Sequence, residues 1–122
     1  MEKVVGIEAR GFIIAAPVAY HFGAGFVPVR KKGKLPGSTY ETAYALEYGE
    51  AVLQVQREAF EPGERVLIVD DVLATGGTVA ATIGLVEAAG GHVVGVSVLL
   101  ELSFLHGRER LGGHDVHALV TV

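Results

Sequence analysis

The sequence contains no cysteine, which excludes disulfide bonds, thiolate zinc sites and cysteine nucleophiles. Basic residues are also few, since 10 Lys and Arg stand against 14 Asp and Glu. The resulting net charge of -4 argues against a nucleic-acid-binding surface. There is no internal repeat, no low-complexity tract and no linker. We therefore expect one domain over residues 1–122, in a chain that fits a reducing compartment.

A long uninterrupted apolar segment is missing as well. Residues 11–29 lack Asp, Glu, Lys and Arg, but Pro17, His21, Gly23 and Gly25 interrupt this stretch. A membrane-spanning helix needs about 20 consecutive, predominantly apolar residues, so we do not expect it to cross a bilayer. Half of the residues are hydrophobic, which argues against a disordered chain. We expect a soluble, cytoplasmic protein with no membrane or nucleic-acid partner.

The most informative stretch, residues 65–80, is R-V-L-I-V-D-D-V-L-A-T-G-G-T-V-A. Its apolar residues 66–69 predict a strand buried on both faces. Asp70 and Asp71 follow, at the strand end where open α/β sheets bind ligands. Adjacent carboxylates there suit ligand hydroxyls or a metal ion.

A turn of small residues comes next and opens into a predicted helix. Its glycines allow close approach of backbone N–H groups to a ligand, and the helix adds the positive end of its dipole. The turn therefore suits an anionic phosphate, but it has neither the G-K-S/T of a Walker A loop nor the G-x-G-x-x-G of a dinucleotide site. The turn consists of Ala74, Thr75, Gly76, Gly77 and Thr78.

Two further loops carry charge. A second predicted strand, loop and helix occupy residues 4–22, with Glu8, Ala9 and Arg10 in the loop. Four of the ten basic residues then lie within five positions, in a loop containing glycine and proline. A solvated basic turn is the simplest interpretation of such a cluster alone, but beside two candidate anion loops it suits a pyrophosphate. The cluster consists of Arg30, Lys31, Lys32 and Lys34.

The remaining pattern predicts an α/β fold. Residues 38–58 alternate as a β-hairpin with its turn at Gly49-Glu50. A helix over 78–89 and strands over 93–100 and 116–122 follow. Because strands alternate with helices, we expect a parallel sheet flanked by helices on both faces, with an inserted hairpin.

Four of these segments resemble the adenine phosphoribosyltransferases, a type I phosphoribosyltransferase family. V-L-I-V-D-D-V-L-A-T-G-G-T resembles their loop for phosphoribosyl diphosphate (PRPP), and G-I-E-A-R-G-F their pyrophosphate loop. F-V-P-V-R-K-K-G-K-L-P and Y-A-L-E-Y-G resemble their basic loop and flexible catalytic hairpin. The resemblance implies purine salvage, in which PRPP and adenine give AMP and pyrophosphate.

The resemblance also implies roles. Asp70 and Asp71 would bind the ribose hydroxyls, and Glu47 would handle the proton at the base, as catalytic residues. Residues 74–78 would hold the 5′-phosphate, and Tyr48 would close over the site as part of the lid. The pyrophosphate-binding residues would be Glu8, Ala9, Arg10, Arg30, Lys31 and Lys34, with the Glu8-Ala9 peptide bond often cis in the family.

The expected cofactor is Mg²⁺, held mainly by PRPP rather than by a protein metal site. The family is usually dimeric, so we expect a homodimer. Family members carry a further segment before the first strand, which forms part of a hood over adenine. We find no counterpart of it in the sequence and expect phosphate binding with little adenine transfer. A PRPP-binding regulatory protein of the same fold and a 6-oxopurine phosphoribosyltransferase remain alternatives.

Overall fold

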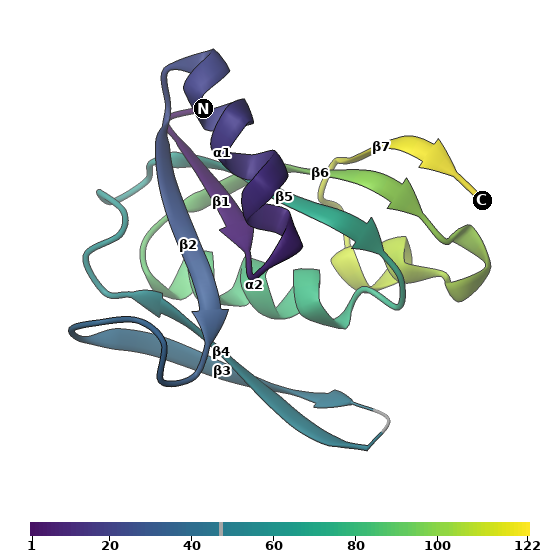
Figure 1. The fold of residues 1–122 in the computed structure, drawn as a ribbon, viewed down its shortest axis with the longest axis horizontal. Coiled ribbons are helices and arrows are strands. Elements are labelled where there is room, and N and C mark those ends of the chain that lie inside the picture. The colour runs from purple at the N-terminus through teal and green to yellow at the C-terminus, as the bar shows by residue number, and fades with distance from the viewer. Residues whose placement is uncertain (47) are drawn as a thin grey trace.

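The computed structural model describes residues 1–46 and 48–122. Their strands form one seven-stranded sheet in the order β3-β4-β2-β1-β5-β6-β7 (Figure 1). The strands are β1 (Lys3–Ile7), β2 (Gly25–Lys31), β3 (Thr39–Leu46), β4 (Gly49–Gln56), β5 (Arg65–Leu73), β6 (His92–Glu101) and β7 (Val116–Thr121). The α-helices are α1 (Arg10–Phe22) and α2 (Gly77–Ala88), and two 3-10 helices, η1 (Ser103–Leu105) and η2 (Gly107–Leu111), lie between β6 and β7.

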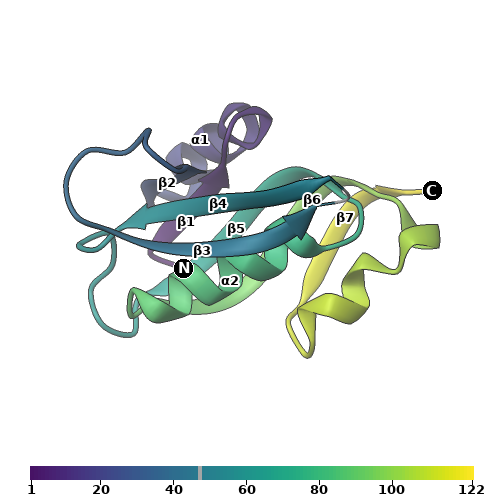
Figure 2. The same ribbon diagram turned by 90° about the horizontal axis from the view of Figure 1, so that it is seen from below.

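Five strands form the parallel part of the sheet, as the alternation of strands and helices predicts. β1 lies between β2 and β5, and β6 continues the sheet toward β7. The helix α1 connects β1 to β2, whereas α2 connects β5 to β6. Figure 2 shows the two helices on opposite faces of the sheet, so the expected arrangement of layers is confirmed.

The hairpin of β3 and β4 makes the sheet mixed. Its two strands pair antiparallel from Thr39 with Gln56 to Leu46 with Gly49, and β4 joins β2 antiparallel at the end of β2. The predicted hairpin is confirmed, but the turn predicted at Gly49-Glu50 is wrong. Gly49 pairs with Leu46 of β3, so Gly49 and Glu50 already belong to β4.

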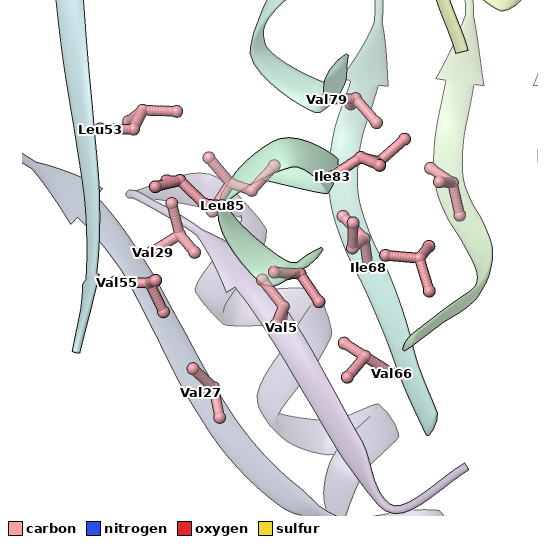
Figure 3. Packing of buried hydrophobic residues seen from close by; sticks show 14 of the residues in the cluster. Val5, Val27, Val29, Leu53, Val55, Val66, Ile68, Val79, Ile83 and Leu85 are labelled. Carbon is pink, nitrogen blue, oxygen red and sulfur yellow. The ribbon is translucent and has the colours of Figure 1, made fainter. Parts of the chain in front are cut away.

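The main hydrophobic core lies between the sheet and α2 (Figure 3). Val79 and Ile83 of α2 face the sheet, where Val5 of β1 and Ile68 of β5 are completely buried. The hairpin shares this core through Leu53 and Val55, which are 2% and 0% exposed. Burial of these two side chains anchors the base of the hairpin.

The opposite face of the sheet is covered by α1 through small residues. Ala15 and Ala19 of α1 pack on Val4 and Val69. The contact is close, because a side chain on Gly6 of β1 would lie 2.7 Å from the Ala15 methyl group. Within the described part of the chain, no helix combines the length and hydropathy needed to cross a membrane.

Candidate active site

A cavity of about 530 Å³ opens at the carboxyl ends of β1 and β5. Its position follows from the topology. From β1 the chain crosses over through α1 to β2 on one side, and from β5 it crosses through α2 to β6 on the other side. The two crossovers diverge, and such a divergence leaves a ligand crevice at the strand ends of an open α/β sheet.

The two adjacent aspartates line this cavity from inside β5 rather than from a loop after it. The strand extends to Leu73, four residues beyond the predicted end at residue 69, because its neighbour β6 continues pairing as far as Glu101. Asp71 forms an ion pair with Arg10, with 2.9 Å between Asp71 Oδ2 and Arg10 Nε. That pair joins the end of β5 to the first turn of α1.

Asp70 is only 8% exposed and lies against the start of α1. A side chain on Gly11 would come within 2.9 Å of Asp70 Oδ1, so the helix backbone packs directly on this carboxyl. Burial raises the pKa of Asp70 to about 7, and the charge of Asp71 adds to the effect. The Asp71 backbone amide and the Arg10 charge oppose the rise. Asp70 is therefore the group in the cavity poised to change protonation near neutral pH.

The phosphate-loop candidate, residues 74–78, lies wholly in the cavity wall. Gly76 is the N-cap of α2, in the left-handed region with φ 88°, and it offers no side chain to cap the helix. The first N–H groups of α2 are therefore available to an anion, with the helix dipole favouring negative charge. Thr78 Oγ1 donates to the Tyr44 hydroxyl at 3.2 Å.

Glu8 organises the basic loop. Its carboxylate accepts hydrogen bonds from Lys34 Nζ at 2.7 Å, the Lys31 amide at 2.9 Å and Arg30 Nε at 3.2 Å. Burial opposes ionisation of Glu8, but these partners outweigh it and hold the pKa of this carboxyl below its usual value. The peptide bond from Glu8 to Ala9 is cis, as the resemblance implies.

The predicted pyrophosphate residues divide into two groups. Glu8, Ala9, Arg10 and Lys31 line the cavity. Arg30 and Lys34 do not belong to the described lining of the cavity, and both pair with Glu8 instead. These two cations therefore stabilise the loop, and any contact between them and a ligand would compete with their ion pairs to Glu8.

Two hairpin residues, Glu47 and Tyr48, carry expected roles that stay predictions. Tyr48 is 89% exposed and does not belong to the described lining of the cavity. Glu47 lies outside the described residues. The hairpin contributes Tyr44 and Leu53 to the cavity instead. Alternation along the hairpin placed Tyr44 on one face, but nothing in the sequence pointed that face at the phosphate loop.

Comparisons with known proteins bear on this site. A model of the family described as phosphoribosyl transferase domain matches residues 2–117. The adenine phosphoribosyltransferase of Acidothermus cellulolyticus is 64% identical over 122 residues, which are 100% of this chain and 69% of that protein. The chain belongs to the adenine phosphoribosyltransferase family.

Solved structures agree with this family in fold. The crystal structure of the adenine phosphoribosyltransferase of Rhodothermus marinus has a TM-score of 0.96 at 56% identity, covering 100% of this chain and 70% of that one. A second structure is that of the Saccharomyces cerevisiae enzyme complexed with D-2,5-dideoxy-2,5-imino-altritol 1,6-bisphosphate and adenine. It has a TM-score of 0.95 at 42% identity, and the match covers 98% of this chain and 67% of that one. The type I phosphoribosyltransferase fold is therefore confirmed.

The chain spans about two thirds of the length of the curated relatives it matches, from 64% to 69% for the first three. The matched part of the family includes both strand ends, the phosphate-loop candidate and the basic loop, since the family model runs from residue 2 to residue 117.

Proposed function

We propose that this chain is the catalytic core of an adenine phosphoribosyltransferase, which transfers the 5-phosphoribosyl group from PRPP to adenine and releases pyrophosphate. The observation that carries the proposal is one cavity with three chemistries. The phosphate loop of residues 74–78 lines it, the acid pair Asp70 and Asp71 lines it, and so do the cations Arg10 and Lys31. PRPP carries a 5′-phosphate, ribose hydroxyls and a pyrophosphate, which match those groups.

The 5′-phosphate fits the start of α2. Backbone N–H groups of the phosphate loop donate to its oxygens, and the hydroxyls of Thr75 and Thr78 add donors. The Thr78 hydroxyl already donates to Tyr44, so phosphate binding exchanges that partner for a phosphate oxygen. Anchoring at this end fixes the ribose in the cavity and supplies orientation for the reaction.

The ribose hydroxyls donate to Asp70 and Asp71. In the reaction, N9 of adenine forms a bond to C1 of the ribose, the bond from C1 to the pyrophosphate oxygen breaks, and the N9 proton leaves. Positive charge develops at C1 as the leaving group departs, and the two carboxylates stabilise it electrostatically. No protein nucleophile takes part, so positioning and charge provide the rate enhancement.

The departing pyrophosphate is neutralised by Arg10 and Lys31. The side chain of Arg10 is 81% exposed and already pairs with Asp71, so its guanidinium can turn toward the leaving group without losing a buried contact. Lys31 is positioned through its backbone amide, which donates to Glu8. Glu47 stays a prediction as the group that handles the N9 proton.

The donor set also fits magnesium. Mg²⁺ prefers one or two carboxylates together with phosphate oxygens and water, and Asp70 and Asp71 are carboxylates on the cavity wall. The third carboxylate there, Glu8, is engaged by three donors of the basic loop. When bound with PRPP, the ion supplies charge neutralisation at the diphosphate. The residues of the cavity would hold the ribose and the diphosphate next to Asp70 and Asp71.

A homodimer in the cytoplasm belongs to the same proposal. Support for association comes from the outer face of α1, where Ile13 is 76% and Tyr20 is 90% exposed. Between them lie Ala16 and Pro17, and no charged residue interrupts this face. An uncharged helix face with small residues at its centre suits close packing against a second copy.

The deciding experiment incubates this chain with PRPP, Mg²⁺ and radiolabelled adenine, and measures labelled AMP and released pyrophosphate. Hypoxanthine and guanine in place of adenine test the 6-oxopurine alternative. The proposal predicts PRPP binding and AMP formation with adenine preferred, at a low rate in this chain, which spans about two thirds of the length of its relatives. PRPP binding without transfer to any base would favour the regulatory alternative, and absence of PRPP binding would contradict both.

A further inference from the structure

The phosphate loop packs against the backbone of η2. A side chain on Gly76 would lie 2.5 Å from the carbonyl oxygen of Gly107. In the reverse direction, a side chain on Gly107 would overlap the carbonyl oxygen of Ala74 and come within 3.2 Å of the Gly76 nitrogen. Two glycines thus let two backbones touch directly behind the phosphate-binding turn.

The need for glycine at the two positions has different physical origins. Gly76 has φ 88°, a conformation that disfavours any side chain. Gly107 lies in the 3-10 helix η2 and is not among the residues with positive φ. Alanine at position 107 would therefore suit the local backbone, and it is excluded by its neighbours, above all by the Ala74 carbonyl oxygen.

The 3-10 helix η2 is itself held rigidly. Arg108 Nε donates to both carboxylate oxygens of Glu101 at 2.9 and 2.7 Å, and Glu101 is 5% exposed. Arg108 also donates to the Val116 carbonyl oxygen at 2.7 Å. Leu111 is 2% exposed in the main core. A bifurcated, charge-assisted hydrogen bond from Arg108 to Glu101 and a buried leucine fix the position of η2, so it supports the loop instead of following it.

We infer that Gly107 is a positioning residue for the phosphate site. By presenting a bare backbone to residues 74–76, it sets the depth and orientation of the turn whose N–H groups bind the 5′-phosphate. This inference rests on the proposed function, because it names what shapes that function's phosphate subsite. The segment Glu101–Leu111 then belongs to the catalytic machinery without touching the ligand.

The test compares Gly107→Ala with Gly113→Ala, a matched control six residues away where a side chain meets nothing within 4 Å. Calorimetry measures the Kd of ribose 5-phosphate and of pyrophosphate for each variant and for the unmodified chain. A displacement of the loop by a fraction of an ångström to one ångström should weaken ribose 5-phosphate binding about ten- to a hundredfold in Gly107→Ala. Pyrophosphate, bound by Arg10 and Lys31, should change by less than about twofold.

Each outcome has a defined meaning. Selective loss of ribose 5-phosphate binding, with the control unchanged, supports the inference. Equal loss of both ligands, or a Gly107→Ala variant that binds like Gly113→Ala, overturns it while leaving the proposed function intact. If the unmodified chain binds no ribose 5-phosphate at all, the proposed function fails and this inference with it.

A second measurement covers the case in which Gly107→Ala does not fold. Amide hydrogen exchange of the unmodified chain, with and without ribose 5-phosphate, reports on both segments. Because η2 is a rigid support, residues 107–111 should exchange slowly already in the free chain, and ligand should slow exchange further at residues 74–78. Rapid exchange of residues 107–111 in the free chain would show that η2 does not support the loop and would overturn the inference.

Discussion

Asp70 and Asp71 are neighbours in the chain but occupy different electrostatic environments. Asp71 pairs with Arg10 in the open part of the cavity, whereas Asp70 is buried against Gly11. Replacing either by asparagine keeps the shape and removes the charge. A hydrogen bond to a charged group contributes about 1.5–3 kcal/mol, so each variant should lower PRPP turnover roughly ten- to over a hundredfold.

Steady-state kinetics with PRPP and adenine measures this effect. Asp115→Asn is the control, since Asp115 is an exposed aspartate outside the described lining of the cavity. Turnover unchanged in both Asp70→Asn and Asp71→Asn would contradict the roles assigned to the acid pair.

The buried carboxyl of Asp70 also predicts a pH dependence of stability. Its folded-state pKa, about 7, lies above its ordinary value of 3.8. The unfolded chain therefore loses this proton more readily, and the stability tied to protonated Asp70 is complete below about pH 4 and lost as the pH rises through 7. Asp70→Asn should thus be more stable than the unmodified chain at pH 8, by a few kcal/mol at most, and equal to it near pH 4.

Urea unfolding of both proteins across this range measures the difference. If Asp70→Asn were less stable at pH 8, the carboxylate would be making a favourable interaction that burial does not outweigh. The same group affects catalysis in the opposite direction, because the charged form is the one that accepts ribose hydroxyl hydrogen bonds. Turnover is therefore expected to rise as the pH increases through about 7.

The residue types of the site were predictable because their chemistry is local. Acids, glycines and threonines at one strand end indicate a phosphate and ribose site in any α/β fold. The division of labour among the cations was not predictable. Arg30 and Lys34 pair with Glu8, a residue more than twenty positions earlier, and that pairing depends on how two loops meet in space.

Among the elements, the hairpin and the phosphate loop are coupled by Tyr44. The tyrosine hydroxyl accepts from Thr78, and its ring lies beside Gly77. Tyr44→Phe keeps the ring and removes the hydrogen bond, which contributes about 0.5–1.5 kcal/mol. We expect faster amide exchange in β3 and ribose 5-phosphate binding that is unchanged or up to about tenfold tighter, because Thr78 no longer has to leave a partner.

Hydrogen exchange and calorimetry on the same samples check this prediction. Tyr40→Phe is the control on the same strand, where the ring packs against Arg57 at 4.3 Å and the hydroxyl is not part of that contact. Weaker ligand binding with unchanged exchange in Tyr44→Phe would mean that the tyrosine hydroxyl contacts the ligand itself.

Element boundaries show where sequence patterns stop being informative. The hydrophobic run predicts the first half of β5, but its second half contains both aspartates and is a strand only because β6 pairs with it. The anchoring of the hairpin is likewise not visible in the sequence pattern, since Leu53 and Val55 are buried in the main core through contacts with other elements. Alternation of apolar residues predicted a two-faced hairpin, whereas packing against α2 decides how deeply its base is buried.

At the scale of the whole molecule, strand order is the feature that creates the site. Alternating strands and helices predict a parallel sheet, but they leave the strand order open. The observed order places β1 beside β5, which brings the loops after both strands into one cavity. Two loops more than sixty residues apart in the sequence thereby line one cavity.

The outer face of α1 is the surface through which we expect two copies of the chain to associate. Its inner face is occupied by the sheet, through Ala15 and Ala19, while Ile13 and Tyr20 remain exposed on the other side. Full burial of such a side chain contributes about 1.5–3 kcal/mol, so a symmetric contact that buries four of them is favourable for association. Ile13→Glu and Tyr20→Glu should therefore shift the chain from dimer to monomer in sedimentation velocity. Because both side chains are exposed in the single chain, the Tm of the monomer should change little. Phe104→Glu, at a 64% exposed phenylalanine in η1, should leave the dimer unchanged. A monomeric unmodified chain at every concentration, or equal dissociation in all three variants, would show that α1 is not the surface through which two copies meet.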